Sequence, residues 1–240
     1  MLFDFLNALK MGDASFLKEA FASLLLSLPI IILALSVHET AHGYVASKLG
    51  DPTARYMGRL SLNPLRHLDP FGFLAMLCFG FGWAKPVPVN SRYFKKPRRD
   101  MAICAIAGPI SNILLAFIFA LLLRLFLMLV NANIYSIAES DMLVSLVKAV
   151  IELLRIGVVL NISLAVFNLF PIPPLDGSKV LYMFLPPNTY FKVLQYERYI
   201  TYGFFLFLML ESFMPISIIS PIVNTVSNGI IDFFNLILFF

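Results

Sequence analysis

The chain has 240 residues, of which 60% are hydrophobic and only 13% are charged, and its mean hydropathy is +0.85. Soluble globular domains average about 45–50% apolar and about 25% charged residues, so this composition excludes them and indicates a membrane protein with several membrane segments. The net charge of +4 is then loop charge that fixes the orientation in the bilayer, and it does not indicate a nucleic-acid-binding surface.

The first long apolar run ends in a HExxH motif. Residues 20–37 are 18 consecutive residues without a charge, close to the roughly 20 that span a bilayer as a helix. His38 and His42 stand four residues apart, so a helix projects both from one face, where they can hold one metal ion between them. Glu39 can take a proton from a water at that metal, and zinc suits this combination best. A chance match is the alternative, but ionisable groups in a membrane segment are costly and argue for a site.

Residues 53–90 are expected to contain a small β or re-entrant element. The apolar run 71–83 has only 13 residues, which is too short to cross the membrane. The segment 86–90 is expected to be extended, because a proline keeps the residue before it out of helical conformations. It can form an edge strand with part of 53–62 and clamp a peptide substrate. Equally, it can be a strand that only packs the core.

The remaining apolar segments complete an all-α polytopic membrane protein with about four to six membrane segments. They cover roughly 101–130, 142–169, 200–219 and 221–240. We expect residues 1–240 to form a single membrane-embedded domain, with a catalytic core over about 20–185 and C-terminal membrane segments over about 200–240.

The basic residues predict the orientation of these segments. Residues 48–69 contain four basic residues and residues 85–100 contain six, whereas residues 131–145 contain none. Since basic loops stay in the cytoplasm, the first two loops are expected there. This predicts a multi-pass protein of the cell membrane, plasma or bacterial inner, with the HExxH motif toward the cytoplasmic side.

A zinc site with two histidines needs a third protein ligand. His67, the only other histidine, lies in an arginine-rich loop and is more simply a loop or surface residue. Asp176 is the stronger candidate, because it lies in the proline-rich break 171–177, which cannot be a regular helix. Gly177 after it allows the backbone to turn sharply. The alternative for Asp176 is a turn aspartate or a helix cap.

Two motifs about 130 residues apart, HETAH at 38–42 and NLFPIPPLDG at 168–177, occur together in this chain. With GRLSLNP at 58–64 and AGPISN at 107–112, they resemble the site-2 protease family of intramembrane zinc metalloproteases over roughly residues 30–185. The resemblance implies that one zinc ion is bound by His38, His42 and Asp176. It also implies that Glu39 is the catalytic glutamate and that Asn112 supports the substrate or the oxyanion.

The function implied by this resemblance is hydrolysis of peptide bonds in or near the transmembrane segments of single-span membrane proteins, within the lipid bilayer. Larger relatives carry a PDZ domain or a CBS pair, and residues 43–175 contain no soluble stretch of that size. A regulatory membrane partner is therefore one candidate for controlling substrate access. A metal-ion transporter or metal-binding module with the same ligands is the alternative. It is disfavoured because neither motif is repeated, and because transport has no evident need of a carboxylate that does not bind the metal. The intact motifs disfavour a catalytically silent scaffold.

Overall fold

Helices make up most of the chain in the computed structural model, which describes residues 14–79, 82–211, 214 and 217–238. The helices are α2 (Ala14–Lys48), α3 (Thr53–Tyr56), α4 (Pro70–Phe79), α5 (Pro97–Ala132), α6 (Ile134–Ala138), α7 (Asp141–Asn168), α8 (Asp176–Phe184), α9 (Pro187–Glu211) and α10 (Ile219–Leu238), with 3-10 turns η1 (Pro64–Arg66) and η2 (Ser91–Tyr93). The described residues contain no strand, which agrees with the predicted all-α class.

The β element predicted within residues 53–90 is not confirmed. The described residues there form α3, η1, α4 and an extended segment, 82–90, that is not assigned as a strand. The backbone chemistry of this segment explains the difference. Pro86 and Pro88 have no N–H to donate, while the N–H groups of Lys85 and Val87 donate to the His67 carbonyl and to the Glu39 side chain.

Three described helices are long and apolar enough to cross a membrane: Leu25–Lys48 within α2, the whole of α5, and α10. The predicted count of four to six segments is therefore not confirmed by helix length and composition. Two further helices, α7 and α9, are also long, and both carry charged residues. In α7 the uninterrupted apolar part begins only after Arg155, and α9 carries three charges in its first half, Lys192, Glu197 and Arg198.

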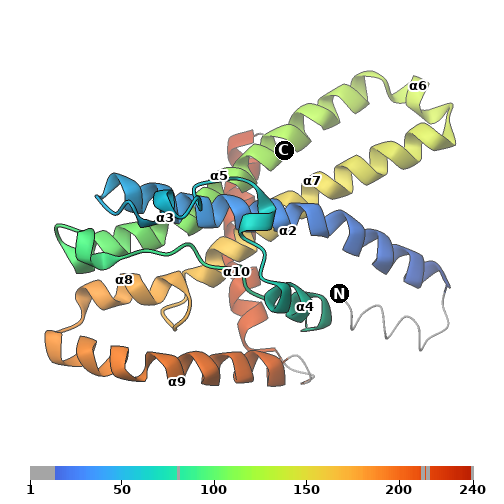
Figure 1. Cartoon of the computed structure of the whole chain (residues 1–240). Coiled ribbons are helices and arrows are strands. Elements are labelled where there is room, and N and C mark those ends of the chain that lie inside the picture. Colours follow the sequence, from blue (N-terminus) through green and yellow to red (C-terminus); the bar gives the residue numbers. More distant parts are fainter. Residues whose placement is uncertain (1–13, 80–81, 212–213, 215–216, 239–240) are drawn as a thin grey trace.

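Helix α5 is the centre of the arrangement and packs against α2, α7 and α8. Figure 1 shows α10 running across these helices, and it contacts both α7 and α5. Small residues allow the close approach of α5 and α7, as is usual between membrane helices. Gly157 of α7 lies against Phe119 of α5, where an added Cβ would come within 2.6 Å of the ring. The large apolar cluster around this crossing includes Ile162 and Phe234.

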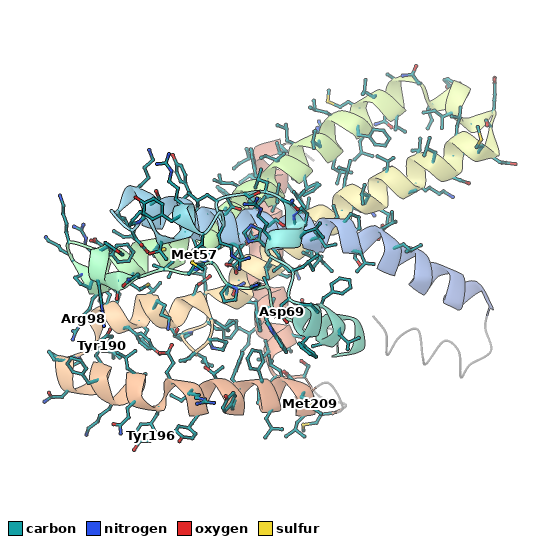
Figure 2. All side chains as sticks on the ribbon, viewed as in Figure 1. Met57, Asp69, Arg98, Tyr190, Tyr196 and Met209 are labelled. Atoms are coloured by element: carbon teal, nitrogen blue, oxygen red, sulfur yellow. The ribbon has the colours of Figure 1, made fainter. Side chains whose placement is uncertain are left out.

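Helices α8 and α9 bring the end of the proline-rich break back to the N-terminal part of α5. Helix α8 packs against α5, and Lys179 of α8 pairs with Glu197 of α9. The Arg98 guanidinium lies 4.3 Å from the centre of the Tyr190 ring, which joins α9 to the first turn of α5 (Figure 2). The break predicted over 171–177 is wrong at its end, because α8 begins at Asp176, directly after the last proline and Leu175. This first residue of α8 is thereby held close to α2.

Candidate metal centre and active site

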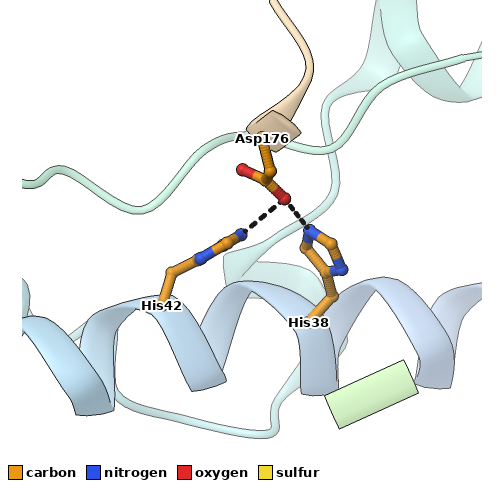
Figure 3. A group of neighbouring side chains, drawn as sticks. All are labelled: His38, His42 and Asp176. Carbon is orange, nitrogen blue, oxygen red and sulfur yellow. Dashed lines mark hydrogen bonds and ion pairs between the residues drawn. The ribbon is translucent and has the colours of Figure 1, made fainter. Parts of the chain in front are cut away.

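Three side chains from two distant parts of the chain meet at the centre of the protein. His38 and His42 of α2 are buried, and Asp176 begins α8. Asp176 Oδ2 lies 3.1 Å from His38 Nε2 and 3.2 Å from His42 Nε2 (Figure 3). Within the described part of the chain these three residues form a group whose candidate ligand atoms all lie within 4.8 Å of one another.

The spacing of these atoms suits zinc. Around a tetrahedral zinc ion with bonds of about 2.0–2.1 Å, neighbouring ligand atoms are about 3.3 Å apart. The two measured distances to Asp176, 3.1 and 3.2 Å, are close to that separation. Two imidazoles and one carboxylate also leave a fourth position open, as in catalytic and not in structural zinc sites.

Gly108 of α5 packs directly against the two imidazoles. A Cβ added there would lie 2.4 Å from His42 Nε2 and 2.6 Å from His38 Nε2. Any side chain at this position would therefore occupy the space beside the two nitrogen atoms that face Asp176. The absence of a side chain at Gly108 keeps this space free.

Hydrogen bonds on the far edge of each imidazole fix its tautomer. His38 Nδ1 lies 2.5 Å from Asn112 Oδ1, and His42 Nδ1 lies 2.8 Å from the Cys104 carbonyl oxygen. Both oxygens only accept hydrogen bonds, so each Nδ1 carries the proton and each Nε2 keeps its lone pair toward Asp176. This is the protonation state that a metal ligand requires.

The orientation of the Asn112 amide is itself fixed by its neighbours. Asn112 is fully buried, and its Nδ2 donates to Asn161 Oδ1 at 3.0 Å and to the Ala34 carbonyl at 3.3 Å. Asn161 Nδ2 in turn donates to the Gly157 carbonyl at 2.8 Å. The network therefore presents the Asn112 oxygen, and not its nitrogen, to His38. The role expected from the resemblance, support of substrate or oxyanion, stays a prediction beside this contact.

Glu39 follows His38 directly but belongs to a different face of α2. Its Oε2 accepts a hydrogen bond of 2.8 Å from the Val87 N–H. The extended segment that carries Val87 is held on both sides of this contact. Lys85 N–H donates to the His67 carbonyl at 2.8 Å, and Asn90 N–H donates to Asp51 Oδ2 at 2.6 Å. Residues 85–90 have no regular secondary structure, but these hydrogen bonds fix them against the HExxH helix. The contact with Glu39 lies between the other two.

His67 is not a member of the three-residue group, as the sequence suggested, but it is not a surface residue either. It is 2% exposed, and its Nε2 donates to the Ser61 carbonyl at 2.6 Å. The same carbonyl accepts a hydrogen bond of 2.9 Å from Thr40 of α2. His67 therefore anchors the loop before α4 to the HExxH helix.

The Asp176 carboxylate completes the group with a negative charge close to the two Nε2 atoms. An ionised carboxylate beside two neutral imidazoles is a donor set that attracts a divalent cation.

Several residues of the site could not be assigned from the sequence. Among them, only Asn161 is indicated by its residue type, because a polar residue within an apolar helix is costly and needs a hydrogen-bond partner. The Cys104 carbonyl and the Val87 N–H are not indicated by residue type, since every residue has a main-chain carbonyl and nearly every residue an N–H. Their roles depend only on which elements pack together.

Comparison with known proteins identifies similar sequences over most of the chain. The family model of peptidase family M50 matches residues 26–210. YwhC of Bacillus subtilis is 42% identical over 209 residues, which cover 86% of this chain and 90% of YwhC. MJ0611 of Methanocaldococcus jannaschii is 32% identical over 148 residues, 60% of this chain and 62% of MJ0611. Rip2 of Mycolicibacterium smegmatis is 28% identical over 166 residues, 66% of this chain and 56% of Rip2. All three are described as putative zinc metalloproteases. No solved structure matches the chain.

Proposed function

Because the chain belongs to peptidase family M50, the site-2 protease family of zinc metalloproteases, we propose that it cleaves peptide bonds in or near the transmembrane segments of single-span membrane proteins. The observation that supports this most directly is that His38 and His42, which lie on a candidate membrane span, Leu25–Lys48, meet Asp176 at the start of α8. A substrate peptide bond that reaches these residues therefore lies within the lipid bilayer or at its edge.

The three residues are proposed as the ligands of one zinc ion, with the fourth position left open. Bound there, zinc supplies a Lewis acid that makes a water molecule more acidic and polarises the scissile carbonyl. The side chains behind the ligands hold the imidazoles in place. Asn112 and the Cys104 carbonyl accept from the two Nδ1–H groups, and so keep both rings in the ligating tautomer.

Glu39 is proposed as the general base. It takes the proton of the attacking water and passes it to the amine that leaves. The Val87 N–H donates to Oε2 of this carboxylate, which orients it and leaves the proton transfer to the other oxygen. In this proposal the segment 86–90 also lies beside the substrate. A transmembrane helix must be unwound before its carbonyl can react, and an extended backbone next to Glu39 can hold the unwound peptide.

The topology and the domain organisation belong to the same proposal. Residues 1–240 form one membrane-embedded metalloprotease domain, with the catalytic core over about 20–185. The basic loops 48–69 and 85–100 face the cytoplasm, so the active site opens toward the cytoplasmic side of a multi-pass cell-membrane protein. The alternative of a metal transporter gains no support, because the relatives are described as zinc metalloproteases.

The experiment that tests the proposal compares wild-type protein with Glu39→Gln. Both are purified, reconstituted in vesicles, and assayed for zinc content and for cleavage of a panel of single-span substrates. Wild-type protein is expected to bind zinc and cleave. Glu39→Gln is expected to bind the same amount of zinc and to cleave about 10²–10⁴-fold more slowly, the usual contribution of a general base.

A matched control and two contrary outcomes make this test decisive. Glu152→Gln changes an exposed glutamate of α7 and is expected to leave both zinc and cleavage unchanged. Cleavage by Glu39→Gln at the wild-type rate would remove Glu39 from the mechanism. Zinc-loaded wild-type protein that cleaves no member of the panel would refute the proposed substrate class.

A further inference from the structure

A cavity of about 590 Å³ lies between α2, α4, α7, α9 and α10. Its size is within the usual range of ligand-binding pockets, about 300–1,000 Å³. Most of its wall is apolar, and the larger side chains there include Ile32, Leu35, Leu164, Phe167, Leu208 and Val223. The ligand that suits such a wall is a group of apolar side chains and not a polar solute.

The α2 wall of this cavity leads directly to Glu39. Ile32, Leu35 and Ser36 line the cavity, and Glu39 follows Ile32 by seven residues and Ser36 by three. Residues with this spacing lie along one face of a helix. The cavity and the proposed general base are therefore neighbours on the same stripe of α2.

The extended segment also connects the cavity with Glu39. Ala84 of the extended segment lines the cavity, and three residues later the Val87 N–H donates to Glu39 Oε2 at 2.8 Å. Between Ala84 and Val87 the backbone is fixed by Arg59, which donates to the carbonyls of Lys85 and Pro86 at 3.1 and 3.0 Å. Helix α2 on one side and residues 84–87 on the other thus run together from the cavity to the catalytic glutamate.

We propose that this cavity is the specificity site of the protease, and that it takes large apolar side chains of the substrate on one side of the scissile bond. The inference rests on the proposed function. Three residues of helix between Ser36 and Glu39 cover about 4.5 Å, and an extended peptide advances about 3.3 Å per residue. The mouth of the cavity is therefore one to two substrate residues from the bond that is cut, and Ile32 lies about three residues from it.

The first test narrows the cavity from α7. Ser163 lines it, so Ser163→Phe is expected to fill part of the space. Val159→Phe is the matched control, because Val159 lies on α7 but is 50% exposed. Both proteins are assayed on one substrate in which each of the three residues on either side of the cut is changed in turn to Ala, Leu or Phe.

Wild-type protein and Val159→Phe are expected to cleave the Leu and Phe forms about tenfold or more faster than the Ala form at one of these positions, the discrimination that an apolar pocket provides. Ser163→Phe is expected to lose this preference while it still binds zinc. Equal rates on all three forms in wild-type protein, or an unchanged preference in Ser163→Phe, would overturn the inference.

The second test does not depend on the rate of cleavage or on a bulky substitution. Ser163→Cys is made in the zinc-binding Glu39→Gln protein, and a cysteine is moved along the substrate under mild oxidation. Disulfides are expected from substrate positions one to three residues from the cut, on one side only. Val159→Cys is the control, and it carries the same native cysteines.

The outcomes separate this inference from the function on which it rests. Cross-linking that is equal for Ser163→Cys and Val159→Cys, or absent from both, would exclude the cavity as the substrate site even if wild-type protein cleaves. Wild-type protein that binds zinc but cleaves nothing would instead refute the proposed function.

Discussion

Replacing Gly108 by alanine tests how closely α5 packs against the two histidines. The new Cβ would lie 2.4 Å from His42 Nε2 and 2.6 Å from His38 Nε2, whereas ordinary contacts begin at 3.4 Å. The two nitrogen atoms must therefore retreat by up to about 1 Å. Zinc–ligand distances tolerate deviations of only about 0.2 Å, so both rings would leave the ligating geometry.

The expected result is a loss of zinc affinity of about 100-fold or more. Changes behind the ligands cost about 10–100-fold in metal affinity, and here the ligands themselves are displaced. A 100-fold loss corresponds to about 2.8 kcal/mol of binding free energy. The helix itself should not suffer, since alanine is favoured over glycine in a helix by about 1 kcal/mol.

The assay is a zinc titration against a competing chelator on monodisperse protein, with thermal unfolding followed in parallel. Gly229→Ala is the matched control, because an added Cβ there meets nothing within 4 Å and Gly229 also lies in a candidate membrane span. It should bind zinc as wild-type protein does. If Gly108→Ala binds zinc with wild-type affinity and cleaves normally, the packing of α5 beneath the imidazoles does not shape the site.

Three further predictions concern the ligands, their support and the topology. Asn112→Ala should weaken zinc binding about 10–100-fold and regain cleavage in excess zinc, if Asn112 acts by holding His38; unchanged zinc affinity with slow cleavage at saturating zinc would favour the oxyanion role instead. Asp176→Ala should lose zinc and cleavage together while His67→Ala keeps its zinc, whereas an aspartate that only caps α8 would cost about 0.5–2 kcal/mol of stability with the zinc retained. Single cysteines placed within residues 91–99 should react only with reagents on the cytoplasmic face of oriented vesicles; labelling from outside would reverse the proposed orientation.

The sequence was informative wherever one helix or one loop carries the signal. His38 and His42 share a face because of their spacing alone, and the 18 uncharged residues at 20–37 indicate a membrane helix by length and composition. Asp176 was distinguishable because the prolines before it interrupt the helical pattern. These inferences depend on the period of a helix and on the chemistry of single residues, which hold wherever the segment lies in the fold.

The extended segment shows where such local reasoning fails. Alternating prolines predicted an edge strand at 86–90, and the backbone is extended there. A strand, however, forms only where a second strand pairs with its backbone, and here the Val87 N–H donates to the Glu39 side chain. The identity of that partner is a property of packing and has no signature in the segment itself.

Tertiary structure alone decided how the site is assembled. It brings the carboxylate of Asp176 within 3.2 Å of both imidazoles, directs Asn112 to His38, and places the backbone of Gly108 where a side chain would displace the rings. It also forms the cavity beside Ser36, from residues of five helices and the segments between them. The physical reason is that a pattern along one segment fixes which face a side chain occupies, whereas its partner is chosen by the packing of elements far apart in the chain.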